Sequence, residues 1–337
     1  MFKVFRDAAG PCLAPAGSVL AVGAFDGLHR GHAALLRRVR ERADARNLIP
    51  AVVSFEPLPR AFFSRAPLPR LSSLREKLCG FRDIGIELAL LLRFNASLAA
   101  MGAEEFVREI IVKRMTAREV WVGADFRFGH RRAGDVALLQ TLGLQLGFEV
   151  HTLQPVEAEE GGRVSATRIR ELLASDGFAQ AARLLGRPFT IDGRVVRGNR
   201  VGHELGYPTA NIRLGRRVSP VHGIFAVRVH GLGGQPRPGV ASLGVRPMFD
   251  GREPLLEAHL FDFDGDLYGR RIEVEFVARL RDEEKFADLD ALKAQMDRDA
   301  AQSREILNRC AGESRSPATS SVAKATGFRI AAARRPE

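Results

Sequence analysis

A change of pattern near residue 188 divides the chain into two regions. From residue 18 to about 186, short apolar runs alternate with helical patterns, which predicts a parallel β-sheet with helices on both faces. After residue 188, short β-rich runs between glycines predict a compact antiparallel barrel or sandwich. The 337 residues suffice for two hydrophobic cores. We therefore expect an α/β protein with two structured domains.

The expected elements follow from the periodicity of the apolar residues. In the first region we expect strands at 18–22, 51–55, 88–92, 119–122 and 148–153, and helices near 31–46, 72–82, 102–115, 133–145 and 167–174. In the second region we expect strands at 189–196, 223–229, 239–243, 255–261 and 272–278, then a helix that includes Phe286 and ends near Cys310. Residues 313–337 are rich in Ser, Ala, Thr and Arg, which predicts a disordered tail.

Two histidines lie at the turn between the first long strand and the first helix. Residues 23–32 read G-A-F-D-G-L-H-R-G-H. Glycines allow the backbone to approach a ligand, and free N–H groups at a helix start attract anions. His29 and His32 could therefore contact the phosphates of a nucleoside triphosphate. The alternative is a glycine-rich turn with incidental surface histidines.

A second segment with anion-binding chemistry lies far downstream, where residues 165–170 read S-A-T-R-I-R. Ser165 or Thr167 can cap the helix that follows. Arg170 could face the same anion, because a guanidinium suits oxygen-rich phosphate. Taken alone, the segment favours an ordinary helix cap with solvated arginines.

Two loops at the ends of predicted strands supply aromatic and acidic side chains. Residues 54–60 read S-F-E-P-L-P-R, and residues 123–129 read G-A-D-F-R-F-G. Asp125 could hold a ribose or an adenine edge, and Phe126 or Phe128 could pack on a flat ring. Each of the three could instead be a turn or core residue.

In the second region, a long glycine-containing segment precedes two oxygen-bearing side chains. Glycines at 198, 202 and 206 suggest a loop that folds closely over a ligand. Thr209 and Asn211 flank Ala210, so in extended chain both side chains point the same way. A hydroxyl and an amide oxygen make a plausible site for Mg²⁺ beside phosphates.

Glu257 lies in a predicted strand, on the face shared with Leu255, His259 and Phe261. We expect this face to point inward and the alternating set of Leu256, Ala258 and Leu260 to point outward. A carboxylate there is either solvated or a general base, and the pattern alone favours solvation.

Composition narrows the possible classes of function. The formal charge of +11 suits nucleic acid, a membrane surface or a small polyanion such as ATP. Few tyrosines and one tryptophan argue against aromatic platforms for nucleic acid. Cys12, Cys79 and Cys310 are far apart, which disfavours disulfides or a zinc site and fits the cytoplasm. We expect no signal peptide and no membrane span, and find neither a Walker nor a protein-kinase motif.

Taken together, the motifs identify a resemblance over residues 15 to about 308. The chain resembles the prokaryotic bifunctional riboflavin kinase/FMN adenylyltransferase family in G-x-F-D-G-x-H-x-G-H, F-E-P-x-P-R, G-x-D-F-R-F-G, S-x-T-R-I-R, L-L-G-R-P, G-x-x-L-G-Y-P-T-A-N, G-V-R-P and D-L-Y-G. The resemblance implies a Rossmann-like nucleotidyltransferase domain over 1–186 that adenylylates FMN. It also implies a six-stranded Greek-key barrel with a terminal helix over 187–312 that phosphorylates riboflavin, before a tail at 313–337.

The resemblance also implies roles for individual residues. His29 and His32 would act on the ATP phosphates, and Glu257 would be the general base on the riboflavin 5′-hydroxyl. Thr209 and Asn211 would bind the magnesium of the nucleotide. The remaining implied contacts are those to nucleotide, by Gly23, Phe25, Asp26, Gly31, Ser165, Thr167, Arg170, Gly198 and Gly202, and those to flavin, by Asp125, Phe126 and Phe128.

The implied ligands are Mg²⁺, ATP as co-substrate, riboflavin, FMN and FAD, with no nucleic acid or membrane partner and with a monomer or a weak homo-oligomer. The chain departs from the family pattern at Leu58, where members usually have histidine. Ala24, Ala166 and Met248 also replace commonly polar residues.

Two other functions remain as alternatives. One is a nucleotidyltransferase for another substrate, such as a cytidylyl or pantetheine-phosphate enzyme, against which the P-T-A-N segment argues. The other is a flavin-binding regulator or a basic nucleic-acid-binding protein without catalysis. The intact His29, His32, Thr209, Asn211 and Glu257 argue against that loss.

Overall fold

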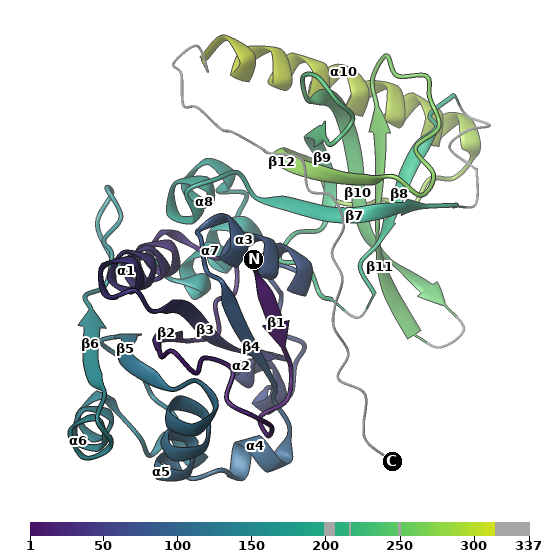
Figure 1. Ribbon diagram of the computed structural model, residues 1–337. Helices are drawn as coiled ribbons and strands as arrows, with labels where there is room; N and C mark the ends of the chain where they lie inside the picture. Colours follow the sequence, from purple (N-terminus) through teal and green to yellow (C-terminus); the bar gives the residue numbers. More distant parts are fainter. Residues whose placement is uncertain (199–205, 216, 249–250, 314–337) are drawn as a thin grey trace. The chain divides into compact units, whose positions relative to one another are not determined.

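The computed structural model describes residues 1–198, 206–215, 217–248 and 251–313 (Figure 1). The described chain forms two compact units. Unit 1 comprises Met1–Leu68 and Leu74–Ser165, and unit 2 comprises Pro69–Ser73 and the described residues from Ala166 onward. The expected domain boundary after residue 186 stays a prediction, and Gly202 lies outside the described residues.

Unit 1 is built on a six-stranded parallel sheet with the order β1-β4-β3-β2-β5-β6. The strand order reverses between β2 and β5, and ligands of such sheets bind beyond the carboxyl ends of strands at that point. The strands are β1 (Lys3–Phe5), β2 (Ser18–Val22), β3 (Ile49–Glu56), β4 (Leu88–Arg93), β5 (Ala117–Gly123) and β6 (Glu149–Leu153).

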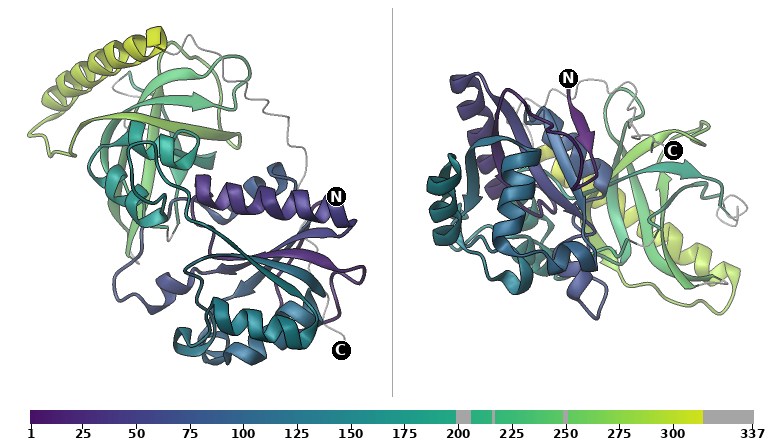
Figure 2. Two further views of the ribbon diagram at one scale, coloured as in Figure 1. Left: turned by 90° about the vertical axis from the view of Figure 1, so that its left-hand side faces the viewer. Right: turned by 60° about the horizontal axis from the view of Figure 1, so that its bottom comes forward.

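Both faces of this sheet are covered, as the continuous apolar runs predict. In β2, Val19 and Ala21 belong to the core beneath α1 and α3, whereas Leu20 and Val22 belong to the opposite core. Figure 2 shows helices on both sides of the sheet. The helices of unit 1 are α1 (Arg30–Arg46), α2 (Pro59–Phe63), α3 (Leu74–Asp83), α4 (Ala96–Ala100), α5 (Ala103–Phe106), the π-helix η1 (Val107–Arg114), the 3-10 helix η2 (His130–Arg132) and α6 (Val136–Leu146).

Unit 2 contains a closed antiparallel barrel in which β10-β11-β8-β7-β12-β9 is the strand order. β9, β10 and β11 follow one another as hairpin neighbours, and β8 lies beside β11, which is the Greek-key arrangement. The elements are α7 (Ala166–Ala174), α8 (Phe178–Leu185), β7 (Thr190–Val196), β8 (Thr209–Arg213), β9 (Gly223–His230), β10 (Arg237–Met248), β11 (Gly251–Leu260), β12 (Arg271–Arg281) and α10 (Leu289–Glu313).

The predicted fold class is confirmed, with two local corrections. In β11 the buried side chains are Leu256, Ala258 and Leu260, so the expectation that Glu257 shares the inward face is wrong. The terminal helix begins at Leu289 rather than near Phe286. Asp288 ends the extended segment, because its side chain accepts a hydrogen bond from the Ala291 N–H at 2.7 Å and so caps the helix.

Candidate functional site

The loop between β2 and α1 has an unusual backbone. Phe25, Gly27 and Leu28 have φ angles of 51°, 76° and 45°. Non-glycine residues adopt this left-handed region only when the surrounding structure holds them there. Phe25 provides such an anchor, since its ring is buried and meets Phe81 edge-on at 5.5 Å.

His29 caps the amino end of α1. Its Nδ1 accepts a hydrogen bond from the His32 backbone N–H at 3.3 Å. An accepting Nδ1 carries no proton, so the neutral ring has its proton on Nε2 as a donor. Gly31 allows this ring position, because an added Cβ there would lie 3.3 Å from the imidazole.

The two imidazoles lie against each other. The rings of His29 and His32 stack at 3.6 Å, and Phe25 contacts His32 edge-on. The pKa of His32 is lowered well below 6.5, first by burial and then by the charges of His29, Lys77 and Arg163. His32 is therefore neutral at pH 7. Its buried Nδ1 has no hydrogen-bond partner within the described chain, so a ligand atom can satisfy it.

Two other residues of this loop that are predicted to bind nucleotide, Asp26 and Gly23, pack inside the loop. Asp26 is 3% exposed. A Cβ added at Gly23 would lie 3.0 Å from the Phe25 ring, so glycine is the residue that leaves space for this ring. The loop thus combines two stacked imidazoles with a helix start at the strand-order reversal.

A cavity of about 520 Å³ lies in unit 1 and is strongly aromatic. This volume lies in the range of small-molecule binding sites. Its wall includes Phe126 and Phe128, two of the three residues predicted to bind flavin, whose rings stack at 5.4 Å. The wall also includes Phe55, Phe63, Phe94, Phe106, Arg60, Arg127, Arg131 and Arg132, which the motif analysis did not single out as a set.

Asp125, the third predicted flavin residue, is not among the described residues of that wall. Its carboxylate accepts a hydrogen bond from Arg163 at 2.8 Å. This hydrogen bond lowers the pKa of Asp125. The side chain therefore stays charged and anchors the Arg163 segment.

The downstream S-x-T-x-x-R segment spans the division between the units. Ser165 immediately precedes α7, as the cap prediction requires, and belongs to unit 1. Thr167 and Arg170 belong to unit 2, where the Arg170 Nε donates to the Pro69 carbonyl at 2.6 Å. That these side chains and the two histidines bind the same phosphates stays a prediction.

In unit 2, the predicted kinase residues meet on two neighbouring strands. Glu257 of β11 lies directly opposite Asn211 of β8, and His259 lies opposite Thr209. Directly opposed residues project from the same face of a sheet. The sequence-distant carboxylate and amide are thus brought together on the face of β11 that is turned away from the barrel core.

Asn211 is the most confined of these groups. It is 5% exposed, and its Nδ2 donates to the Thr209 carbonyl and hydroxyl at 3.2 and 3.3 Å. Its Oδ1 is buried with no partner in the described part of the chain. An orphaned amide oxygen beside a hydroxyl fits a hard cation such as Mg²⁺.

A cavity of about 400 Å³ opens beside these side chains. Thr209, Asn211 and Gly198 line it, together with the turn from Phe263 to Tyr268. A Cβ at Gly198 would lie 2.6 Å from the Asn211 Nδ2, so the backbone approaches the amide as closely as a glycine permits.

Two side chains that the motif analysis missed hold this segment. The His259 Nδ1 donates to the Pro208 carbonyl at 2.9 Å, and the Tyr207 hydroxyl donates to Asp297 of α10. Burial and then Asp297 raise the pKa of Tyr207 to about 12. Both contacts fix the chain immediately before Thr209. Tyr207 and Pro208 lie in the G-Y-P-T-A-N string, whereas His259 lies outside it, in β11.

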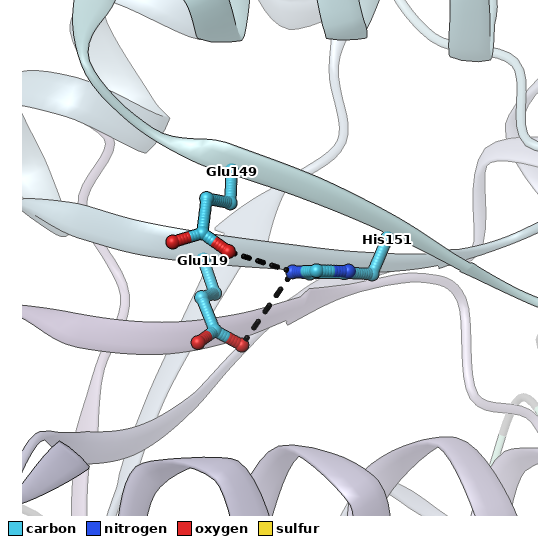
Figure 3. A group of neighbouring side chains, drawn as sticks. All are labelled: Glu119, Glu149 and His151. Carbon is cyan, nitrogen blue, oxygen red and sulfur yellow. Dashed lines mark hydrogen bonds and ion pairs between the residues drawn. The ribbon is translucent and has the colours of Figure 1, made fainter.

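A third polar cluster, drawn in Figure 3, lies near the amino ends of β5 and β6. Glu119, Glu149 and His151 place potential metal ligands within 4.8 Å of one another. The Glu119 carboxylate already accepts hydrogen bonds from Arg42, Arg46 and Trp121. Two guanidinium groups supply the positive charge, so we interpret the cluster as an ion-pair network that ties α1 to the sheet.

Among the described residues, no helix has both the length and the apolarity to cross a membrane.

Comparisons with known proteins also divide the chain into two parts. A model of the FAD synthetase family matches residues 13–168, and a model of the riboflavin kinase family matches residues 185–307. The bifunctional riboflavin kinase/FMN adenylyltransferase of Escherichia coli K12 is 47% identical over 292 residues, covering 86% of this chain and 93% of that protein. The Haemophilus influenzae protein of the same name is 39% identical and covers 87% and 95%.

A solved structure is similar across both units. A protein from Streptococcus pneumoniae, described as a macrolide-efflux protein, matches with a TM-score of 0.74 and 31% identity over 90% of this chain and 99% of that one. Each family model names one activity, and the relatives from Escherichia coli and Haemophilus influenzae carry both activities in one name. This chain therefore belongs to the family of bifunctional riboflavin kinases/FMN adenylyltransferases.

Proposed function

We propose that unit 1 transfers an adenylyl group from ATP to FMN at the loop that carries His29 and His32. The attacking FMN phosphate is already an anion, so the reaction needs positioning and charge neutralisation rather than a base. The Nε2 proton of His29 and the amino end of α1 supply donors for the ATP phosphates. The new bond joins the FMN phosphate to the α-phosphate, and pyrophosphate leaves.

The aromatic cavity is the proposed flavin site of unit 1. Phenylalanine faces suit an isoalloxazine ring, and edge or offset packing stabilises such pairs. Arg60 and Arg127 in the wall could pair with the FMN phosphate. In this assignment Phe126 and Phe128 bind flavin, and Asp125 orients Arg163 through their hydrogen bond.

Unit 2 is the proposed site of riboflavin phosphorylation. Glu257 removes the proton from the 5′-hydroxyl while the oxygen attacks the γ-phosphate of ATP, and ADP leaves. Thr209 and Asn211 would hold Mg²⁺, which neutralises phosphate charge when bound. Gly198 lets its backbone approach the Asn211 amide closely, because any side chain there would collide with it. The three separated free cysteines favour a reducing cytoplasm, and we expect a monomer or a weak homo-oligomer.

One observation carries the assignment: each unit has a cavity lined by residues of its family motifs, Phe126 and Phe128 in unit 1 and Thr209 and Asn211 in unit 2. The test is to incubate the chain with riboflavin, ATP and Mg²⁺ and to separate riboflavin, FMN and FAD. Glu257→Gln should lower riboflavin phosphorylation by roughly 10²–10⁴-fold and leave FMN conversion to FAD intact. Glu273→Gln, at an exposed position of β12, is the matched control.

The complementary variants act on unit 1. His29→Ala and His32→Ala should accumulate FMN from riboflavin without forming FAD, and the exposed His222→Ala should behave as wild type. Full FAD synthesis by both histidine variants would place the adenylyl site elsewhere. Near-normal phosphorylation by Glu257→Gln would remove its role as the base.

A further inference from the structure

Lys77 of α3 is a completely buried lysine. Its exposed fraction is 0%, although α3 lies at the surface of unit 1. Burying an ammonium group is costly unless several polar groups compensate for the lost water. The groups that compensate for it therefore indicate why a lysine occupies this position.

The ammonium group joins the ends of two neighbouring strands. Its Nζ donates to the Ala24 carbonyl at 3.0 Å and to the Phe55 carbonyl at 3.4 Å. The Glu56 carboxylate lies 3.8 Å away and supplies the opposite charge. Ala24 follows β2, whereas Phe55 and Glu56 end β3, which pairs with β2 in parallel.

These two strand ends lead to the two proposed ligand sites of unit 1. The Ala24 loop continues into His29 and His32, and Phe55 lines the aromatic cavity. Ser54 also donates to the Ala24 carbonyl, at 3.2 Å, so this carbonyl has two donors. A single cation therefore fixes the distance between the phosphate loop and the flavin wall.

We propose that Lys77 is a positioning residue for adenylyl transfer, one that aligns the FMN phosphate with the α-phosphate of ATP by joining the two loops. The proposal rests on the proposed function of unit 1. In-line transfer depends on geometry, and a displacement of about 1 Å can cost about 10²-fold in rate. The charge of Lys77 also contributes to the lowered pKa of His32, which keeps that imidazole neutral.

The test compares Lys77→Met with Lys77→Gln in the full chain. Methionine keeps most of the side-chain volume but donates no hydrogen bond, whereas glutamine retains a donor without the charge. We expect Lys77→Met to lower kcat for FAD synthesis by about 10–100-fold and to change KM for FMN and ATP by less than about threefold. Lys77→Gln should recover part of kcat.

Riboflavin phosphorylation by unit 2 of the same molecules is the internal reference and should stay at the wild-type rate. Ser18→Ala is the matched control, because it removes another buried hydrogen bond to a carbonyl, that of Met115 at 2.7 Å, near the amino end of β2. Its kcat for FAD synthesis should be unchanged.

Three results would overturn the proposal: a wild-type kcat in Lys77→Met, an equal loss in Ser18→Ala, or loss of folded unit 1 in both lysine variants. His29→Ala separates this failure from that of the proposed function. If His29→Ala abolishes FAD synthesis while Lys77→Met does not, only the inference about Lys77 fails. If neither variant affects FAD synthesis, the proposed adenylyl site itself is wrong.

Discussion

Glu119 should stabilise unit 1 through its charge, so Glu119→Gln is a sharp test of the electrostatic reasoning. The side chain is fully buried, and its carboxylate accepts hydrogen bonds from Arg42, Arg46 and Trp121. Burial alone would raise the pKa of Glu119, but these hydrogen bonds outweigh burial and lower the pKa from 4.5 to about 2.

The magnitude follows from linkage. Lowering a pKa from 4.5 to about 2 corresponds to about 3 kcal/mol of the free energy of unfolding. Arg42 and Arg46 are 38% and 37% exposed, so solvent screening reduces this contribution to about 2 kcal/mol. An amide also removes the carboxylate that Arg42 pairs with, whereas Arg46 keeps its ion pair with Glu149, and we expect a loss of about 2–3 kcal/mol at pH 7.

The sign of the pH dependence is fixed because the pKa is lowered in the folded state. The contribution of Glu119 to the free energy of unfolding is fully present above the pKa of 4.5 that the side chain has in the unfolded state. It is lost as the pH falls through the folded-state pKa of about 2. The stability difference between wild type and Glu119→Gln should therefore narrow by about 1–2 kcal/mol between pH 7 and pH 3. Glu119→Gln should keep its rate of FAD synthesis at 25 °C, because Glu119 lies near the amino end of β5.

The chain supplies its own probe for this measurement. Trp121 is the only tryptophan, lies in β5 and contacts Glu119, so its fluorescence reports the unfolding of unit 1. A domain of this size should lose roughly 4–12 °C in Tm. A difference below about 1 kcal/mol, or one that does not change with pH, would refute the reasoning.

Two further predictions concern unit 2. Gly198→Ala should lower riboflavin phosphorylation by at least about tenfold while FAD synthesis continues, because the new Cβ would meet the Asn211 amide at 2.6 Å; a flavin separation assay checks it. A fragment that starts at residue 166 should melt several degrees above one that starts at residue 187, because Phe178 packs on the barrel residue Phe225. Equal melting temperatures would place the autonomous boundary after α8.

The sequence predicted the fold well where burial imposes a simple pattern. Strands buried on both faces appear as continuous apolar runs, and the long helices of unit 1 show a clear period. Elements of three to five residues are too short for a period, so β1, β8, α2 and α4 were not among the expected strands and helices. Helix α8 was not expected either, although its buried Phe178, Ala181, Leu184 and Leu185 have helical spacing. The helix expected at 102–115 divides into α5 and the π-helix η1, a change of hydrogen bonding that apolar spacing does not encode.

The face of Glu257 shows a different limit. Alternation in β11 separates two sets of side chains, but both sets contain leucine, and the pattern does not say which set is buried. The neighbouring strands decide, because Leu256 and Ala258 face Leu243 and Ala241 of β10, which are also buried. Strand pairing is a non-local property, so a correct strand assignment still gave the wrong face.

The candidate sites likewise differ in whether they depend on local sequence or on contacts between distant segments. His29 and His32 are three residues apart, and one helix turn suffices to stack them, so a motif could find them. The aromatic cavity and Lys77 depend on chain segments far apart in sequence. A lysine in an amphipathic helix is ordinarily solvated, and only its hydrogen bonds to the carbonyls of Ala24, after β2, and of Phe55, in β3, reveal a buried role.

Leu58 shows how a departure from the family pattern can be consistent with the chemistry. The family usually has histidine there, but Leu58 is 2% exposed, and its carbonyl accepts the Phe62 N–H at 3.1 Å at the start of α2. No proton needs to leave the attacking FMN phosphate, so the transfer does not require an imidazole at this position. The lowered pKa of His32 and the occupied Nδ1 of His29 point the same way, since neither group is set up as a base. Under the proposed function, unit 1 relies on hydrogen-bond donors and alignment, whereas unit 2, which would phosphorylate a hydroxyl group, uses the carboxylate of Glu257.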